Sequence, residues 1–485
     1  MEQRQMQQTT KANRRQNSSV QPRQFDVLVV GLGTTGMYAA KRLAAAGKHV
    51  AVFEKGPRGT MCIRTGCMPS KALFVPAHHV EHLSVYKSIL AGKSDVSKLD
   101  IPKLFDWMRK QRKSFIDYRL QSEDSSGFTR IDGEARLIDA HTVVCNDVAY
   151  CAPFIVLCTG SKVSVPQISG LSTTPYFTSD NLFEQKEILG KSIIIFGGGV
   201  IGCEMAQFFC SIGFKVTIIA RHSPLLRMFD DDVSRALENA FLAKGIKIVY
   251  DEKVESAAYT APAAFDGCGK FTLVSGKIKK GSEKKEYIAD NLLVSAGRSP
   301  NHATGIELAG VKLKDGRIVR NGFCQTSVPH IYSGGDESGI QLLHEARQEG
   351  EYIANHILGE VSDAYTSPKM QIAFTYPHIA SVGAHEKDLV TGKYLCAVVS
   401  FDEGRSILEG ATSGMMKITT DLHGKLLGAS CVNDYADHLI QSILPYVQYE
   451  MHVSKITDCY HPTQQEVFLD LRDDILAQLA KHNKI

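Results

Sequence analysis

Two cysteines five positions apart, Cys62 and Cys67, are the residues of this chain best placed for redox chemistry. In a regular helix, positions i and i+5 are rotated by about 140° and separated by roughly 7.5 Å of rise. A disulfide needs Cβ atoms about 3.8 Å apart. The pair can therefore close only where the backbone between the cysteines is irregular, and Gly66 makes such a distortion cheap.

A histidine near the C-terminus is the second candidate. His461 is followed by Pro462, which indicates a turn that exposes the imidazole. Glu466 follows about one helical turn later and can bond one ring nitrogen. The other nitrogen is then available to act as a base.

The first segment able to position such chemistry is a nucleotide-binding pattern. A strand over residues 25–30 is followed by Gly31, Gly33 and Gly36, a helical run to residue 46, and a strand over residues 49–53 that ends at Glu54. The glycines permit a tight turn and close approach of a pyrophosphate to the helix N-terminus, and the acid can accept from a ribose hydroxyl. This combination predicts a dinucleotide site.

A second pattern of the same kind begins with a strand over residues 192–196. Its glycines are Gly197, Gly199 and Gly202, and a strand over residues 215–219 follows. Two such sites in one chain imply electron transfer between two nucleotides. Ala220 stands where the first pattern has its acid, and Arg221 and Arg227 follow. Arginines in place of the acid favour a 2′-phosphate, so NADP(H) is expected over NAD(H).

Three further segments are candidates for cofactor contact. Thr159 and Gly160 lie in a small-residue turn that lets the backbone cross near a cofactor. Gly297 lies in the segment that closes the second nucleotide unit. Asp336 ends a strand over residues 331–333 after a glycine pair, which suits a ribityl hydroxyl or phosphate-side contact. Residues 246–274 are expected to form antiparallel strands and residues 101–126 a helix, and we predict no metal site.

Composition narrows the remaining possibilities. The net charge is +3 and the basic residues are spread along the chain, so nucleic-acid binding is not indicated. No apolar run reaches the roughly 18 residues that a membrane helix needs. Residues 1–24, rich in Gln, Asn, Ser and Arg, are expected to be a disordered tail. The other ten cysteines are scattered singly, which favours a reducing cytoplasm.

Together these motifs resemble the pyridine nucleotide-disulfide oxidoreductases from about residue 25 to the C-terminus, and within them dihydrolipoamide dehydrogenase. The resemblance implies an α/β homodimer with two Rossmann-like dinucleotide-binding domains and a C-terminal α+β dimerisation domain. The implied parts are an FAD-binding domain in two pieces (residues 25–163 and 286–360), an NAD(P)-binding domain (164–285) and a dimerisation domain (361–485).

The resemblance also implies a role for each candidate. Cys62 would be the interchange thiol that meets substrate, and Cys67 the thiol next to the flavin. His461, oriented by Glu466, would act on Cys62 of the partner subunit. The matching residues Lys71 and Glu204 form a pair that in relatives lies beside the flavin and nicotinamide, which makes both catalytic candidates and Lys71 also a cofactor contact.

The immediate neighbours of the thiols depart from the family pattern. Met61, Arg64 and Thr65 replace the usual residues around the cysteines, and the stretch from Ala220 to Arg227 resembles glutathione reductase. The expected substrate is a dihydrolipoamide-type dithiol or a lipoyl domain. The alternatives are an NADPH-dependent reductase of glutathione or another small disulfide, and a docking or NAD(P)-sensing component of a 2-oxoacid dehydrogenase complex. A mercuric reductase is not expected, because the chain lacks a C-terminal cysteine pair.

Overall fold

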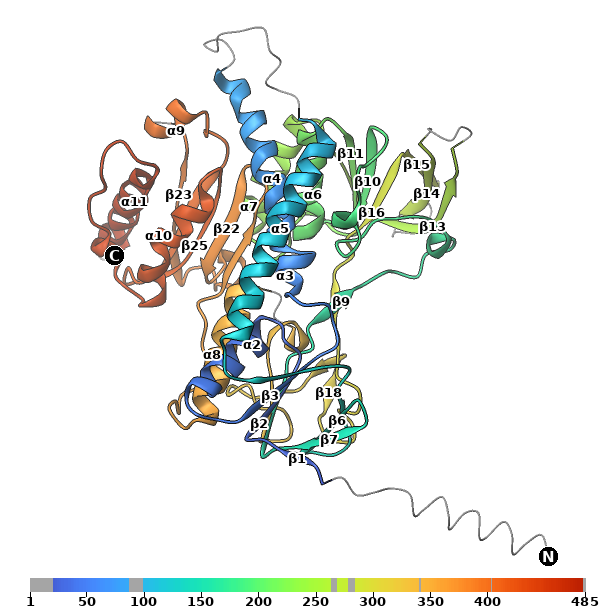
Figure 1. The fold of residues 1–485 in the computed structure, drawn as a ribbon. Coiled ribbons are helices and arrows are strands. Elements are labelled where there is room, and N and C mark those ends of the chain that lie inside the picture. The colour runs from blue at the N-terminus through green and yellow to red at the C-terminus, as the bar shows by residue number, and fades with distance from the viewer. Residues whose placement is uncertain are drawn as a thin grey trace, which may run out of the picture. The chain divides into compact units, whose positions relative to one another are not determined.

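The computed structural model describes residues 21–86, 99–262, 268–277, 284–339, 342–402 and 404–482, and it confirms the predicted α/β class (Figure 1). The chain divides into two compact units, each built from segments far apart in the sequence. Unit 1 comprises Met1–Thr60, Ile116–Lys162 and Ser299–Tyr365, and unit 2 comprises Met61–Phe115, Val163–Arg298 and Thr366–Ile485.

Most of the predicted N-terminal tail lies outside the described residues. Its predicted end at residue 24 was wrong by two residues, because β1 (Arg23–Gln24) pairs in parallel with β7 (Val148–Cys151). The ladder supplies partners for the backbone groups of this short segment.

Unit 1 is built on a parallel five-stranded sheet. Its strands, in spatial order, are β20 (Ile331–Ser333), β8 (Phe154–Leu157), β2 (Val27–Val30), β3 (Val50–Glu54) and β4 (Thr129–Asp132). The central strand β2 reads Val-Leu-Val-Val and is buried at every position. Such an unbroken apolar strand indicates a parallel sheet that is covered on both faces.

Two layers provide that cover. On one face, helices α2 (Thr34–Ala45) and α8 (Leu343–Ile357) lie side by side (Figure 1). Their close approach depends on Gly350, where a Cβ would lie 2.4 Å from the carbonyl oxygen of Thr35. The other face shares a buried core with a small sheet of β1, β7, β6 (Thr142–Cys145) and β5 (Arg136–Leu137).

The nucleotide-binding part of unit 2 contains a second parallel sheet. Its strands, in spatial order, are β12 (Lys247–Tyr250), β11 (Lys215–Ala220), β10 (Ser192–Phe196) and β16 (Asn291–Val294). Helix α6 (Val200–Ser211) joins β10 to β11, and α7 (Asp231–Ala243) joins β11 to β12. The antiparallel expectation for residues 246–274 was therefore wrong for β12, because a helical crossover returns the chain in the parallel direction. It was right for β13 (Glu252–Thr260) and β14 (Lys270–Lys277), which continue into β15 (Lys285–Ala289).

Three helices follow Thr60 in the sequence. They are α3 (Met61–Arg64), α4 (Cys67–His82) and α5 (Ile101–Asp124). The last confirms the helix predicted over residues 101–126.

The C-terminal part of unit 2 is an antiparallel five-stranded sheet with two main helices. The strands, in spatial order, are β21 (Met370–Ala373), β22 (His378–Gly383), β25 (Leu426–Asn433), β24 (Met415–Asp421) and β23 (Tyr394–Ser400). Helices α10 (Ala436–Gln448) and α11 (Val467–His482) bury Leu439 and Leu471 in one core with Ile418 of the sheet.

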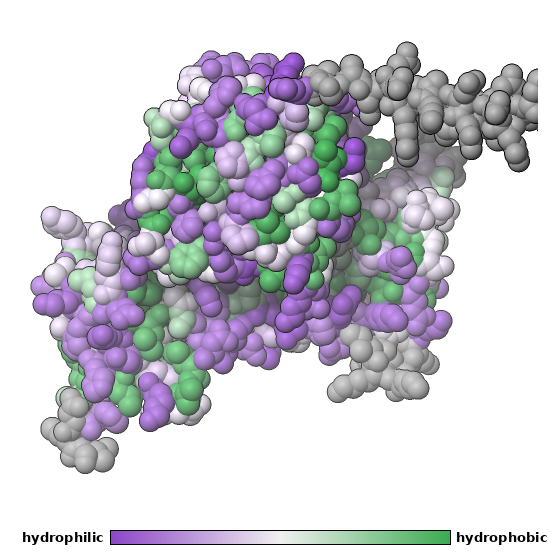
Figure 2. Space-filling model, turned by 90° about the horizontal axis from the view of Figure 1, so that it is seen from below, coloured by the Kyte–Doolittle hydropathy of each residue, from purple (hydrophilic) through white to green (hydrophobic). Residues whose placement is uncertain are grey.

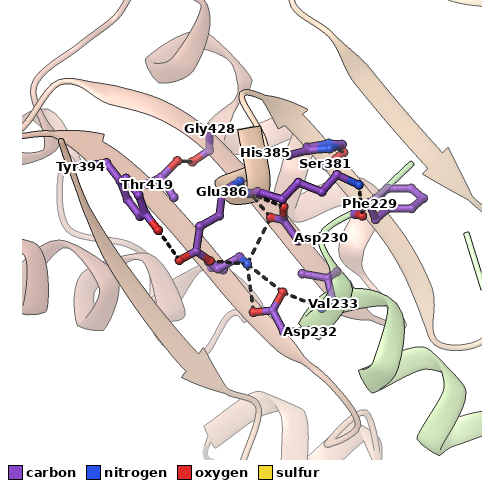
Figure 3. Close-up of polar contacts among 12 residues, drawn as sticks. Phe229, Asp230, Asp232, Val233, Ser381, His385, Glu386, Tyr394, Thr419 and Gly428 are labelled. Carbon is purple, nitrogen blue, oxygen red and sulfur yellow. Dashed lines mark hydrogen bonds and ion pairs between the residues drawn. The ribbon is translucent and has the colours of Figure 1, made fainter. Parts of the chain in front are cut away.

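A buried lysine joins this sheet to the nucleotide-binding part of the same unit. Lys417 of β24 is 2% exposed and lies 3.1 Å from Asp230, 2.8 Å from Asp232 and 2.8 Å from Glu386. Figure 3 shows the three carboxylates converging, with Tyr394 donating to Glu386 over 2.9 Å. Burial alone would lower the pKa of Lys417, but its hydrogen bonds to Asp232 and Glu386 outweigh burial and raise that pKa. We call these four charged residues the Lys417 cluster.

Among the described helices, none combines the length and apolar character that crossing a bilayer requires. On the face drawn in Figure 2, hydrophilic residues separate groups of hydrophobic ones.

Candidate active site

The two candidate redox thiols flank a break between two helices. Cys62 lies in α3, and Cys67 is the first residue of α4. Gly66 forms the break, and a Cβ on it would lie 3.2 Å from both the Cα of Cys62 and the carbonyl oxygen of Met61. The irregular backbone required by the five-residue spacing is therefore present, and a side chain at position 66 would crowd the backbone of Met61 and Cys62.

The thiols are free and joined by a hydrogen bond from Cys62 to Cys67. That bond, more than any other influence, lowers the pKa of Cys67 to about 7, and the nearby charge of Lys71 lowers it further against the effect of burial. The same bond, together with burial, raises the pKa of Cys62. One thiol of the pair is thus set to ionise near neutral pH and the other to keep its proton. A thiolate is the reactive form of cysteine.

Lys71 and Glu204 form the predicted pair. The ammonium of Lys71 lies 2.9 Å from each carboxylate oxygen of Glu204, whose side chain is 8% exposed. Glu204 also accepts a hydrogen bond of 2.8 Å from the backbone N–H of Phe374, whose ring lies 4.5 Å from the same ammonium. Lys71 lies one helical turn after Cys67 in α4. Its side chain is held there by Glu204 of α6 and by Phe374, which follows β21.

His461 and Glu466 form a second local pair. Nδ1 of His461 lies 2.7 Å from Oε1 of Glu466, and the imidazole is 78% exposed. The other oxygen of Glu466 accepts from the backbone N–H of Thr463 in a capping box, which orients the carboxylate. The hydrogen bond from His461 lowers the pKa of Glu466, so the carboxylate stays ionised. Nε2 of the ring is then the nitrogen available for proton transfer.

Two separate groups result from these contacts. Within the described part of one chain, no hydrogen bond or ion pair joins the thiols to the His461–Glu466 pair. These bonds do not link the two pairs within the described residues of one chain. A reaction that uses both pairs therefore needs another arrangement that brings the imidazole to the thiols.

In unit 1, the first glycine pattern forms the predicted turn between β2 and α2. Gly31 has φ of 102°, and a Cβ there would lie 2.3 Å from the carbonyl oxygen of Cys158. A Cβ on Gly36 would lie 2.1 Å from the carbonyl oxygen of Gly31. Gly33 is the N-cap of α2, and no side chain caps that helix end. Its N–H groups therefore suit an anionic ligand such as a pyrophosphate.

Glu54 lies at the end of β3, as expected. One of its oxygens accepts from the N–H of Leu32 in the glycine turn, and the other from Gly56, both over 2.7 Å. These bonds hold the carboxylate beside the turn, and each oxygen keeps a lone pair for a ribose hydroxyl.

The other predicted cofactor contacts of unit 1 are also close together. Ser161, next to Gly160, donates to Asp336 over 2.5 Å. Thr159 donates through its N–H to the carboxylate of Glu337 over 2.8 Å and through its hydroxyl to the carbonyl of Asn301. The turn after β8 and the turn after β20 thus form one polar region at the carboxyl ends of neighbouring parallel strands, where open α/β sheets bind ligands.

The second glycine pattern repeats this geometry in unit 2. Gly197 has φ of 128°, and a Cβ there would lie 2.3 Å from the carbonyl oxygen of Ser295. A Cβ on Gly202 would lie 2.1 Å from the carbonyl oxygen of Gly197. Gly199 is the N-cap of α6, again without a capping side chain. Gly297, with φ of 105°, is exposed in the segment after β16.

The end of β11 has no acid to meet a ribose. Ala220 is 2% exposed and packs in the core, whereas Arg221 and Arg227 are exposed. The backbone carbonyl of Arg227 accepts from the ammonium of Lys387 over 2.6 Å, which fixes the loop that carries both arginines.

Models of one protein family match most of the chain. The family model described as pyridine nucleotide-disulphide oxidoreductase matches residues 25–350, and the dimerisation-domain model of the same family matches residues 370–472. The chain belongs to the pyridine nucleotide-disulphide oxidoreductases.

Members of this family with different activities are similar to the chain to about the same degree. A mercuric reductase of Lysinibacillus sphaericus is 29% identical over 90% of this chain and 80% of the relative. A dihydrolipoyl dehydrogenase of Chlamydia trachomatis is 30% identical over 92% of this chain and 96% of the relative. The solved structure of the HOCl-induced flavoprotein disulfide reductase RclA from Escherichia coli aligns with a TM-score of 0.80 at 23% identity, over 93% of this chain and 99% of the other.

As a pyridine nucleotide-disulphide oxidoreductase, the chain is a flavoprotein enzyme that uses FAD and NAD(P) and carries a dimerisation domain, which supports a homodimer. The N-terminus of α2 fits that flavin, because no side chain caps this helix end and its N–H groups can bind a pyrophosphate. The identities do not separate one family activity from another.

Sequence reasoning missed one cation beside the first nucleotide turn. Arg119 of α5 donates to the carbonyl of Leu32 over 3.3 Å, and Glu123 holds it over 2.9 Å. Arg130 contacts the same carboxylate over 2.8 Å. The i,i+4 spacing of Arg119 and Glu123 was a visible signal of a helical ion pair, but no local signal connects α5 to the glycine turn.

Two buried acids in unit 1 were also missed. Glu337, beside Asp336, accepts from Thr159, and Glu349 of α8 accepts from the N–H of Gly335 over 2.7 Å and pairs with Arg320 over 2.5 Å. Both acids have side chains with no exposed surface. They position the turn that carries Asp336.

Proposed function

We propose that the protein is an FAD-dependent dithiol/disulfide oxidoreductase that exchanges electrons between a dihydrolipoamide-type dithiol and NAD(P) through Cys62 and Cys67. The observation that carries this proposal is the pair itself. One thiol is hydrogen-bonded to the other, and the pKa of Cys67 is lowered to about 7 beside a lysine. Buried thiols without a thiol partner behave differently, since burial raises the pKa values of Cys158 and Cys431.

The proposed reaction starts with Cys62 and Cys67 joined as a disulfide. His461 of the partner subunit takes a proton from the substrate dithiol through Nε2, while Glu466 of the partner subunit holds Nδ1. The substrate thiolate attacks the sulfur of Cys62, a mixed disulfide forms, and Cys67 leaves as a thiolate. The second substrate thiol then displaces Cys62, which releases the substrate as a disulfide. Two electrons and two protons have moved from the substrate to the enzyme and its base.

The residues around Cys67 suit it as the leaving group. Its low pKa makes it the better leaving thiolate of the two, and the higher pKa of Cys62 suits the sulfur that exchanges with substrate. Bound FAD supplies the two-electron acceptor through which the reduced pair is reoxidised and the nicotinamide is reduced. Lys71, fixed by Glu204, holds a positive charge near the thiolate throughout.

The end of β11 favours NADP(H) as the nicotinamide. The buried Ala220 offers no acceptor for a free 2′-hydroxyl, and exposed Arg221 and Arg227 suit a 2′-phosphate. The same observation favours a second candidate function, an NADPH-dependent reductase of glutathione or another small disulfide. That reaction runs the same thiol exchange in the opposite direction.

Steady-state turnover separates these functions. The purified holoenzyme is assayed with dihydrolipoamide, lipoamide and glutathione disulfide, each with NAD(H) and NADP(H). The leading proposal predicts turnover of the lipoamide couple, and exclusive turnover of glutathione disulfide with NADPH would replace it with the second candidate. No turnover of any couple, together with copurification with an acyltransferase core, would show a docking or sensing component.

A further inference from the structure

Three metal-ligating side chains meet at the opposite end of α4 from Cys67. His78 and His82 lie one turn apart on this helix, and Asp434 lies between β25 and α10. One donor atom from each lies within 4.8 Å of the donor atoms of the other two. A zinc ion with bonds of about 2 Å holds its ligands roughly 3.4 Å apart, so small side-chain rotations are enough to close the set.

The setting of the three side chains matches what a cation needs. Within the described residues, no hydrogen bond or ion pair reaches the carboxylate of Asp434, which is partly buried. The ring of His78 stacks on Tyr376 with a centroid separation of 3.4 Å and an interplanar angle of 1°, which fixes its orientation.

The charged neighbours are accounted for by contacts of their own. Glu81, on the same helix, pairs with Lys244 over 2.8 Å and accepts from Ser211 over 2.5 Å, so it is not available as a fourth ligand. Its negative charge balances that of Lys244. His378, which acts electrostatically on both His78 and Asp434, pairs through Nδ1 with Asp437 over 3.2 Å.

We propose that His78, His82 and Asp434 bind one divalent cation of the zinc type. Two imidazoles and one carboxylate form a recurrent zinc ligand set, in which a water completes the coordination. The ion would join the last turn of the helix that begins at Cys67 to the connection between β25 and α10 in the same unit. This site is independent of the proposed substrate and nicotinamide.

The test is zinc binding by the holoenzyme after treatment with a chelator and its removal. Because cysteine thiolates are zinc ligands in general, the measurements use Cys62→Ser/Cys67→Ser protein as the common background. Zn²⁺ is titrated in competition with a chromogenic chelator, and the thermal midpoint is recorded with and without the ion. The proposal predicts one ion per subunit and a higher midpoint with zinc.

His82→Gln and Asp434→Asn should each weaken zinc binding at least ~10-fold, since even residues that only orient metal ligands contribute 10–100-fold. The matched control is His79→Gln, which changes an exposed histidine of the same helix turn. The side chains of His82 and Asp434 are only partly buried, so both variants are expected to fold. Retained FAD and an unchanged thermal midpoint in the absence of zinc verify this. The proposal is overturned if the background protein binds no zinc, or if His82→Gln and Asp434→Asn bind it as tightly as His79→Gln.

Discussion

Removal of the Cys62 thiol should raise the pKa of Cys67 by about two units. In the structure, the hydrogen bond from Cys62 is the largest influence that lowers this pKa from 9.0 to about 7. Cys62→Ala removes the donor. Burial and the charge of Glu204, which raise the pKa of Cys67, then act against the charge of Lys71, which lowers it. At pH 7 about half of the Cys67 thiol is ionised when the hydrogen bond is present, and about 1% when it is absent. The fraction of thiolate thus falls roughly 50-fold.

The rate of alkylation of Cys67 by iodoacetamide, followed by mass spectrometry of its peptide across the pH range, measures this shift. A thiolate with a higher pKa is also more nucleophilic, roughly eightfold for two units if the Brønsted coefficient for disulfide exchange applies. The net loss of rate at pH 7 is therefore only about sixfold. The midpoint of the rate–pH curve is the better readout, and it should move from about 7 toward 9.

Cys62→Ser is the matched control. Its hydroxyl can still donate to Cys67, so its midpoint should stay close to that of the wild-type dithiol. If Cys62→Ala titrates at the wild-type midpoint, the hydrogen bond does not set the acidity of Cys67 and the reasoning is refuted. In that case the charge of Lys71 becomes the leading cause.

Three further predictions concern the rest of the molecule. His461→Ala should reduce kcat by about 10²–10⁴-fold, with the thiols still reducible by NADPH. Unchanged kcat in this variant would contradict the role of His461 as base. Glu466→Gln should reduce turnover and change the pH profile of kcat. Replacement of Arg221 and Arg227 by Ala should raise KM for NADPH while leaving KM for NADH nearly unchanged, and an equal effect on both nucleotides would contradict 2′-phosphate recognition. Lys417→Met should lower the free energy of unfolding, measured in urea, by about 3 kcal/mol. This value is near the lower end of the range for a broken buried ion pair, because two of the three carboxylate partners of Lys417 are partly exposed. A variant as stable as the wild type would show that the Lys417 cluster contributes nothing to stability.

The sequence predicted the parts of the site whose signals are local. Gly31 and Gly36 follow from the turn chemistry of one nucleotide pattern, and a side chain at either would overlap a carbonyl oxygen. The five-residue spacing of the thiols required a backbone break, and Gly66 provides it. The pairing of His461 with Glu466 likewise follows from a separation of about one helical turn.

Contacts between distant segments left no such signal. Arg119 reads as one charge among many on a helix, yet it reaches Leu32. Lys417 lies in a strand and reads as solvent-facing, because its carboxylate partners come from elements far away in the sequence. Asp434 is separated from His78 by most of the chain, so their positions in the sequence do not indicate a shared cation. Only the folded chain brings these residues together.

The central claim is that Cys67 is the thiol through which electrons pass to the flavin. Its most direct test is the long-wavelength charge-transfer absorbance of the holoenzyme after anaerobic reduction by two electrons, compared between the wild type and Cys67→Ser. The proposal predicts a band in the wild type that is lost in the variant. Cys62→Ser has no disulfide to take the two electrons, so it should show the band before any reduction, from the Cys67 thiolate and the oxidised flavin. A normal band in Cys67→Ser would contradict the assignment.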